Sequence, residues 1–415
     1  MSTRRQFLTH AASAAGGLFC TTRLAFAGAT AASGGRRPRL VLIVMRGALD
    51  GLAAVPPYGD RDYAALRGEA ALHAPGAPGG ALALDGFFGL HPALEFLGQS
   101  YRARELLVLH ALASPYRERS HFDGQDVLEN GTPRPHALQS GWLNRALAHL
   151  PGAHPREAGV ALGQNVPLVM RGPAAVTSWS PSKLAAPDED TLARLTDLYA
   201  GDALLAQRLA DGLAADAIAA EDGAGMTPLP PAAGDAARPR AAHSARYAET
   251  VRAAAEFLRQ EDGPQVAVFD TSGWDTHANE GGAQGQLATR LAGLDAALAS
   301  LRQELGAAWG DTAVLAITEF GRTAAINGTR GTDHGTATAA FLIGGAVAGG
   351  RVLADWPGLA PRQLYQGRDL APTLDLRAVL KGVLAGHLGV STRALDEEVF
   401  PDSARLRPLA GLMRA

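Results

Sequence analysis

Short apolar runs recur along the chain, and residues typical of turns bound each of them. Five runs predict strands: Leu40–Met45, Leu106–Leu109, Val266–Phe269, Ala313–Ile317 and Ala339–Ile343. They are rich in Leu or β-branched residues and do not alternate cleanly with polar ones, which is typical of strands buried on both faces. We therefore expect a sheet that other elements cover on both sides.

Helical periodicity occupies the segments between these runs. Apolar residues spaced by three and four predict a helix over Leu287–Leu305, and Leu370–Leu388 predicts a final helix region that could begin after Pro372. A shorter helix is expected over Asp126–Asn130. Strands that alternate with helices predict an α/β fold with a parallel or mixed sheet.

Residues 185–245 differ from the rest of the chain. They are Ala-rich, with helical periodicity near Leu192–Leu213, and then become the Pro/Ala/Gly stretch Thr227–Arg240. We interpret this segment as a helical insertion followed by a flexible loop.

The first 27 residues are typical of a twin-arginine signal peptide. Arg4 and Arg5 precede a weakly apolar stretch that has no acidic residue and ends in Ala25-Phe26-Ala27. The alternative is an amphipathic first helix of the fold. The apolar stretch is too short to span a bilayer stably. We expect a periplasmic or secreted protein of residues 28–415, without a transmembrane anchor in the mature chain.

Composition narrows the classes of partner and ligand. Residues 1–27 contain three of the 38 basic residues and none of the 41 acidic ones, so the remainder carries a formal charge of −6. Such a balance does not favour nucleic-acid binding. Cys20, the only cysteine, leaves with the signal. Any metal ligands in the mature chain are therefore oxygen and nitrogen atoms, which suit zinc, manganese, magnesium or calcium.

Polar residues gather where the predicted strands end, which is where ligands bind in open α/β sheets. The candidates are Arg46 and Asp50 after the first run, Asp275 and His277 after the third, Glu319 and Arg322 after the fourth, and Asp333 and His334 just before the fifth. Their coincidence predicts one shared polar site that could hold a divalent metal.

Each candidate residue could also have a purely structural role. Asp275 and His277 face the same side of an extended backbone and could hold a cation, but Asp-X-His alone is a weak motif. Asp333 could shape a turn, and His334 could be a satisfied interior histidine. A charge at Glu319, after an apolar strand, is expensive unless a metal or a partner such as Arg322 binds it.

The segment Ser120-His121-Phe122-Asp123 has two readings as well. Ser120 could be a nucleophile at the start of a helix, or it could cap that helix as part of a Ser-X-X-Asp capping box. His121 could be a metal ligand or a base. Arg46 and Arg322 could clamp an anionic oxyacid through their planar guanidinium groups, or they could be ion-pair partners.

These motifs resemble the bacterial domain-of-unknown-function 1501 family (DUF1501). The resemblance rests on the exported N-terminus and on Arg46–Leu52, Arg119–Phe122, Gly273–His277, Thr318–Thr323, Asp333–Gly335 and Gly367–Leu388. That family is related to the alkaline phosphatase and sulfatase superfamily. The resemblance implies a single domain, a three-layer α/β sandwich with a mostly parallel central sheet and a metal site at the strand ends.

The same resemblance implies roles for individual residues. It places metal ligands at Asp50, Asp275, His277, Glu319 and His334, with Asp333 as a further candidate, and a nucleophile at Ser120. The chain lacks the C/S-X-P-X-R context of a sulfatase nucleophile, and Glu319-Phe320 stands where the superfamily has Asp-His. One metal or none is therefore expected.

We expect an exported metal-dependent hydrolase of phosphate or related esters, acting on a small-molecule or polymer ester. The alternatives are a non-catalytic protein that binds another exported protein or a surface polymer, and a purely structural metal site.

Overall fold

The computed structural model describes residues 37–151, 158–181, 189–220 and 238–414. The predicted signal peptide and most of the predicted flexible loop lie outside the described residues. No helix in the described ranges combines the length and the apolar character that a membrane crossing requires.

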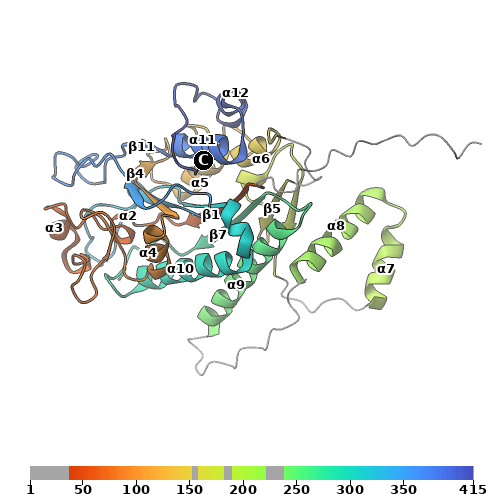
Figure 1. Ribbon diagram of the computed structural model, residues 1–415, viewed down its shortest axis with the longest axis horizontal. Helices are drawn as coiled ribbons and strands as arrows, with labels where there is room; N and C mark the ends of the chain where they lie inside the picture. Colours follow the sequence, from red (N-terminus) through yellow and green to blue (C-terminus); the bar gives the residue numbers. More distant parts are fainter. Residues whose placement is uncertain (1–36, 152–157, 182–188, 221–237, 415) are drawn as a thin grey trace, which may run out of the picture. The chain divides into compact units, whose positions relative to one another are not determined.

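A nine-stranded sheet forms the centre of the fold (Figure 1). Its strands are β1 (Arg39–Arg46), β4 (Leu106–Ala113), β5 (Gly159–Leu162), β6 (Val176–Trp179), β7 (Val266–Ser272), β8 (Thr312–Ile317), β9 (Thr338–Ile343), β10 (Arg351–Leu353) and β11 (Leu374–Asp375). They lie in the order β10-β4-β9-β8-β1-β7-β5-β6, with β11 also beside β4. Every pairing is parallel except those of β9 with β8 and β4. The predicted mostly parallel sheet is confirmed.

Helices cover both faces of this sheet. They are α2 (Gly51–Ala54), α3 (Tyr63–Arg67), α4 (Glu95–Arg102), α5 (His121–Asn130), α6 (Trp142–Leu147), α7 (Glu189–Tyr199), α8 (Ala203–Ala220), α9 (Arg238–Arg259), α10 (Gln286–Leu305), α11 (Leu376–Leu388) and α12 (Thr392–Ala394). In Figure 1, α4, α9 and α10 lie below the sheet, and α5, α6 and α11 lie above it. A small hairpin, β2 (Leu82–Ala83) with β3 (Gly89–Leu90), stands apart.

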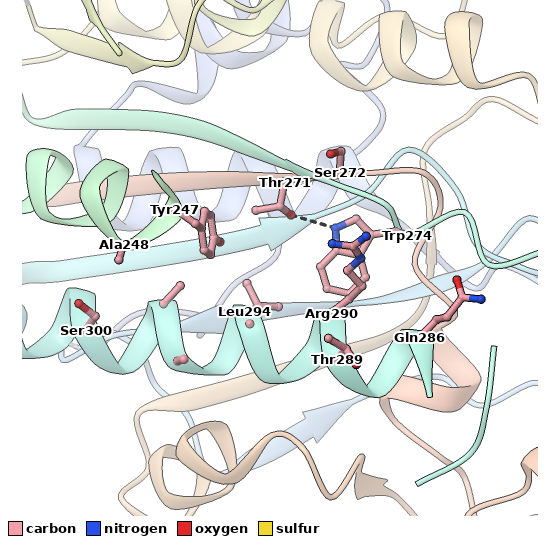
Figure 2. Close-up of a pocket in the computed structure, with 13 residues that line it drawn as sticks. Tyr247, Ala248, Thr271, Ser272, Trp274, Gln286, Thr289, Arg290, Leu294 and Ser300 are labelled. Carbon is pink, nitrogen blue, oxygen red and sulfur yellow. Dashed lines mark hydrogen bonds between the residues drawn. The ribbon is translucent and has the colours of Figure 1, made fainter. Parts of the chain in front are cut away.

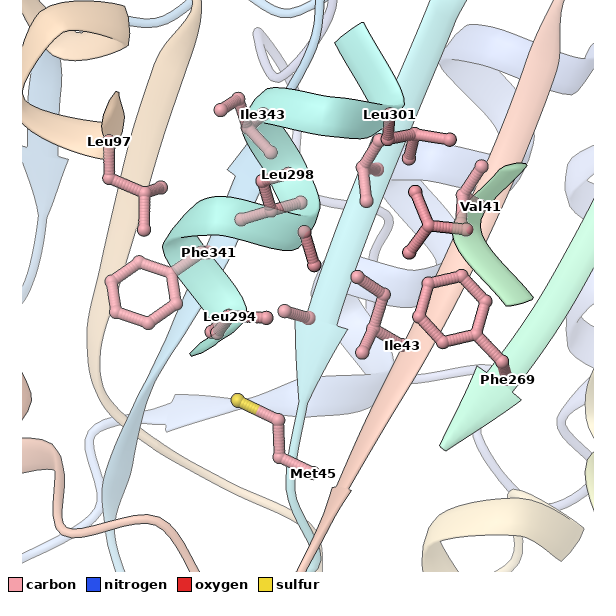
Figure 3. Close-up of a cluster of buried hydrophobic side chains, with 14 of the residues drawn as sticks. Val41, Ile43, Met45, Leu97, Phe269, Leu294, Leu298, Leu301, Phe341 and Ile343 are labelled. Atoms are coloured by element: carbon pink, nitrogen blue, oxygen red, sulfur yellow. The ribbon is translucent and has the colours of Figure 1, made fainter. Parts of the chain in front are cut away.

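The central strand β1 shows why its sequence does not alternate. Val41, Ile43 and Met45 face a core shared with α4, α9 and α10 (Figure 3). Leu40, Leu42 and Val44 face a second core, which α6 and α11 close. Since both faces are buried, both sets of positions must be apolar. The three-layer arrangement is thereby confirmed.

All five apolar runs form strands, and the Leu287–Leu305 periodicity matches α10. Two helices begin elsewhere than expected. The helix expected from Asp126 begins at His121, and α11 begins at Leu376, where the Asp375 side chain accepts a hydrogen bond from the Arg377 amide. Helices α7 and α8 occupy the expected helical insertion.

The direction of β9 determines where the site forms. The carboxyl ends of β1, β4, β7 and β8 share one edge of the sheet. Because β9 runs the opposite way, its beginning lies at that same edge. The loops that follow β1, β4, β7 and β8 and the loop that precedes β9 therefore meet at this edge.

Candidate metal centre

Three imidazoles and one carboxylate converge at this edge. His334 Nε2 lies 2.9 Å from His121 Nε2 and 3.0 Å from His277 Nε2. Asp275 Oδ1 lies 3.0 Å from His277 Nε2 and 3.2 Å from His334 Nε2, and Asp275 Oδ2 lies 3.4 Å from His121 Nε2. Residues separated by more than 200 positions thus place four ligand atoms around one point.

The other ring nitrogen of each histidine contacts an oxygen that can only accept a hydrogen bond. His121 Nδ1 lies 2.8 Å from Glu319 Oε1, His334 Nδ1 lies 2.9 Å from the Arg119 carbonyl oxygen, and His277 Nδ1 lies 3.3 Å from Asp333 Oδ1. These partners place the proton of each neutral ring on Nδ1, which leaves a lone pair on each Nε2. A metal ion or a proton between these nitrogens would offset the repulsion of their lone pairs, and the hydrogen bond to Glu319 raises the pKa of His121.

The spacing of the ligand atoms of His121, Asp275 and His334 is compatible with a metal ion. Tetrahedral ligands at about 2.0–2.1 Å from zinc lie about 3.3 Å from one another. The contacts around the cluster range from 2.9 to 3.4 Å. The group of His121, Asp275 and His334 could hold a metal ion, and His277 Nε2 lies 3.0 Å from both His334 Nε2 and Asp275 Oδ1.

Arg322 holds the cluster's carboxylate in its charged form. Its buried guanidinium donates to Asp275 Oδ1 and, through Nε, to the Thr332 hydroxyl at 3.1 Å. Burial opposes the charge on Asp275, but the Arg322 contact prevails and lowers the pKa of Asp275. Arg322 therefore acts as a partner of Asp275 and not as the free anion clamp that the sequence suggested, nor does it pair with Glu319.

Glu319 contacts the histidine cluster through Nδ1 of His121. Its buried carboxylate accepts hydrogen bonds from the Gly47 amide at 2.9 Å, Gln125 Nε2 at 3.1 Å and the Thr318 hydroxyl at 2.8 Å. Burial raises the pKa of Glu319, but its hydrogen bonds, that to His121 foremost, lower it below the usual value. This carboxylate faces Nδ1 of His121, on the side of the ring away from the converging nitrogens. Such a carboxylate fixes the ring and strengthens its basicity.

Asp333 has a similar position beside His277. It accepts from Asn327 Nδ2 at 3.1 Å and lies against Nδ1 of His277. It is half exposed, so its hold on the ring is weaker than that of Glu319. The structure therefore makes Asp333 a positioning carboxylate as well.

Asp50 belongs to a different cluster. It accepts from the Ala53 amide at 3.0 Å as the N-cap of α2, and its other oxygen pairs with Arg67 at 2.5 Å. Glu280 lies 3.4 Å from the same guanidinium and accepts from the Thr332 hydroxyl at 2.7 Å. All three charged side chains are fully buried. The two oxygens of Asp50 contact Ala53 and Arg67, so Asp50 belongs to this buried cluster and not to the histidine cluster.

Arg46 is likewise bound to protein carboxylates. It pairs with Glu129 at 2.7 Å and with Asp270, and it donates to Gln125 at 3.1 Å. This network joins the ends of β1 and β7 to α5. The structure thus gives Arg46 the ion-pair role that the sequence left open.

Ser120 stands directly before α5, but its side chain makes no capping hydrogen bond. Ser120 is thus the N-cap residue of α5 without the side-chain hydrogen bond of a capping box. Its two chain neighbours both contact the cluster, His121 through its ring and Arg119 through its carbonyl oxygen. Ser120 itself is partly exposed.

Two further arginines lie near the cluster. Arg119 donates to Asp369 at 2.8 Å and to Gln366 at 2.6 Å, and Arg368 donates to the His334 carbonyl oxygen at 2.6 Å. Sequence reasoning assigned neither a role, although Arg119 directly precedes Ser120. His121 was only one option among several there, because nothing in the sequence showed that its helix begins at that residue.

The profile of a family described as "Protein of unknown function (DUF1501)" matches residues 109–399. The chain belongs to this family. The matched range contains every residue of the histidine cluster and its positioning carboxylates, whereas Arg46 and Asp50 precede it. No curated protein matches the chain.

Several solved structures are similar at low identity. One is Ps i-CgsB in complex with k-i-k-neocarrahexaose, with 11% identity, a TM-score of 0.40 and coverage of 87% of this chain and 74% of that one. Another is the zinc complex of the C-terminal periplasmic domain of EcEptC from Escherichia coli, with 10% identity, a TM-score of 0.34 and coverage of 75% and 73%. A third is an inactive murine ectonucleotide pyrophosphatase/phosphodiesterase 5 in complex with AMP, with 10% identity, a TM-score of 0.27 and coverage of 69% and 57%.

Proposed function

We propose that this protein is an exported, metal-dependent hydrolase of phosphate or related anionic esters. The supporting observation is the convergence of three Nε2 atoms and one carboxylate oxygen, each imidazole being fixed through its Nδ1. Zinc, which favours nitrogen and oxygen ligands in tetrahedral geometry, fits this set best. A bound cation would polarise the ester and lower the pKa of an attacking hydroxyl.

The remaining groups supply attack and charge. Ser120 is the proposed nucleophile, because its hydroxyl is not engaged as a cap and both of its neighbours contact the cluster. The start of α5 favours negative charge through its unpaired amides and its dipole. Arg119 and Arg368 add positive charge nearby, and guanidinium groups bind phosphate and sulfate oxygens well. These features favour an anionic ester over a neutral one.

Metal analysis of the purified protein tests the proposal first. We expect about one zinc or manganese ion per chain, and loss of that ion in His121→Ala and His334→Ala. His149→Ala is the matched control, because His149 contacts Glu398 and none of the cluster residues. A folded wild-type protein that binds no divalent metal would end the metal-dependent reading.

An activity screen tests the chemistry. Phosphomonoesters, phosphodiesters and sulfate esters are offered to the metal-loaded protein, with Ser120→Ala beside it. We expect Ser120→Ala to retain metal and to lose at least a hundredfold in kcat. Metal-loaded protein that hydrolyses none of these esters would favour the non-catalytic binding role. Export is tested by Arg4→Lys with Arg5→Lys, which should keep the protein in the cytoplasm.

A further inference from the structure

A cavity of about 700 Å³ lies between α9, α10 and the end of β7, apart from the histidine cluster (Figure 2). Its lining includes Tyr247 from α9, Thr271 and Trp274 from β7 and the loop after it, and Arg290 and Gly293 from α10. A cavity of this size can hold a small organic molecule. The metal-dependent chemistry proposed above uses none of these side chains.

Two aromatic residues are among the lining residues, and Tyr247 is the partly exposed one. Trp274 is buried, and its indole Nε1 donates to the Thr271 hydroxyl at 2.9 Å, which fixes the ring. Tyr247 approaches from the opposite helix, edge-on to Phe269. Its hydroxyl is buried and has no hydrogen-bond partner. A buried polar group without a partner costs about 1–3 kcal/mol. A ligand atom that bonds to this hydroxyl would remove the cost.

Arg290 supplies an unneutralised charge. It makes no hydrogen bond or ion pair with any described residue, although it lines the cavity. Its guanidinium packs against Gly273, where an added Cβ would come within 2.8 Å of Arg290 Cζ. Gly273 also has a φ of +92°, which side chains rarely adopt. Because Gly273 has no side chain, the Arg290 guanidinium can pack against this loop at the cavity. No described acidic residue pairs with it there.

Helix α10 presents small residues on the side that faces the cavity. Gly293 lies in the interior of this helix, where glycine costs about 1 kcal/mol relative to alanine. A Cβ at Gly293 would meet nothing within 4 Å. Ala296, Ala297 and Ser300 continue the same lining with small side chains. The space is therefore built by the sequence of α10 and is not a packing defect at a single residue.

We propose that this cavity binds a small aromatic ring that carries one anionic group. The ring lies against Tyr247 and the small side chains of α10, the anion pairs with Arg290, and a polar substituent bonds to the Tyr247 hydroxyl. This site is separate from the metal centre: Trp274 packs into the core between the sheet and α10, whereas the neighbouring Asp275 side chain contacts the histidines.

Binding of naphthalene-2-carboxylate, compared with neutral naphthalene-2-carboxamide, tests the assignment. Isothermal titration calorimetry of the full chain should show the acid binding at least tenfold more tightly than the amide. Arg290→Gln should abolish that preference, and Gly293→Phe, which fills the space, should weaken both ligands at least tenfold. Arg208→Gln and Gly212→Phe are matched controls on α8, since Gly212 also faces open space. Both controls should bind as wild type.

Substitutions at the metal centre test whether the two sites are independent. His121→Ala and His334→Ala should bind the acid normally, so a failed metal assay leaves this inference standing. Equal affinity for acid and amide would overturn it. So would undiminished binding in Gly293→Phe, or no saturable binding of the acid at millimolar concentration. Arg290 is exposed at the helix surface, so Arg290→Gln gives an answer even where Gly293→Phe unfolds the protein.

Discussion

Replacing Glu280 with glutamine should change how stability depends on pH. Glu280 is buried beside Asp50, and the two carboxylates share the single guanidinium of Arg67. Burial, and then the charge of Asp50, raise the pKa of Glu280 to about 8. Burial also opposes the charge of Asp50, but Arg67 prevails and lowers the pKa of that carboxyl. At neutral pH the folded protein therefore keeps a proton on Glu280.

The size of the effect follows from proton linkage. An unfolded glutamate titrates near pH 4.5, whereas the folded one titrates near pH 8. Between these values the folded state binds one more proton than the unfolded state, so the free energy of unfolding falls as pH rises. The slope is about 1.4 kcal/mol per pH unit, or about 3 kcal/mol between pH 5.5 and 7.5. Below pH 4.5 the contribution of Glu280 is fully present.

Urea denaturation at pH 5.5, 6.5 and 7.5 measures this slope. Glu280→Gln places an amide where the protonated carboxyl donates, and it does not titrate. Relative to wild type, the variant should gain about 3 kcal/mol across that interval. Glu249→Gln, at an exposed position of α9, is the control and should show no such gain. A difference between wild type and Glu280→Gln that stays constant with pH would refute the protonated buried glutamate.

Two further substitutions test the site and the core. Glu319→Gln should lower metal affinity about 10–100-fold in a chelator competition assay, because His121 loses its charged partner, while Asp333→Asn, at a half-exposed carboxylate, should have a smaller effect. Leu298→Ala in the core between the sheet and α10 should lower the free energy of unfolding by about 2–5 kcal/mol in urea titrations. The exposed Leu204→Ala on α8 should cost less than about 0.5 kcal/mol. A Leu298→Ala loss no larger than that of Leu204→Ala would contradict the packing described for α10.

Burial on both faces made the central strands predictable. Leu40–Met45 of β1, Ala313–Ile317 of β8 and Ala339–Ile343 of β9 are apolar because each residue meets one of the two cores, so the runs stand out in the sequence. The strands β5 and β6 have four residues each, which is too short for a distinct pattern. The start of α5 was missed for a related reason: its first turn, His121–Gly124, contains the site residue His121 and an exposed phenylalanine, Phe122, and helical periodicity is absent there.

The location of the site could be predicted from the sequence, but the role of each residue within it could not. Asp275, His277 and His334 meet because strand ends share one edge of the sheet. A carboxylate at that edge can ligate a cation, orient an imidazole or pair with an arginine, and sequence alone does not distinguish these outcomes. Glu319 and Asp333 orient imidazoles, and Asp50 pairs with Arg67. The pairing of Asp50 with Arg67 depends on α3, whose last residue, Arg67, reaches the loop that follows β1.

For the proposed hydrolase, the two charge clusters together bear on which ester the site would favour. Arg67 offsets the charge of Asp50, and a protonated Glu280 adds none, so the buried cluster is neutral overall. The histidine cluster contributes only one carboxylate charge that faces the metal position, and Arg322 already pairs with it. A divalent cation would therefore leave net positive charge there. Because Coulomb attraction strengthens as water is excluded, this charge should favour anionic over neutral esters.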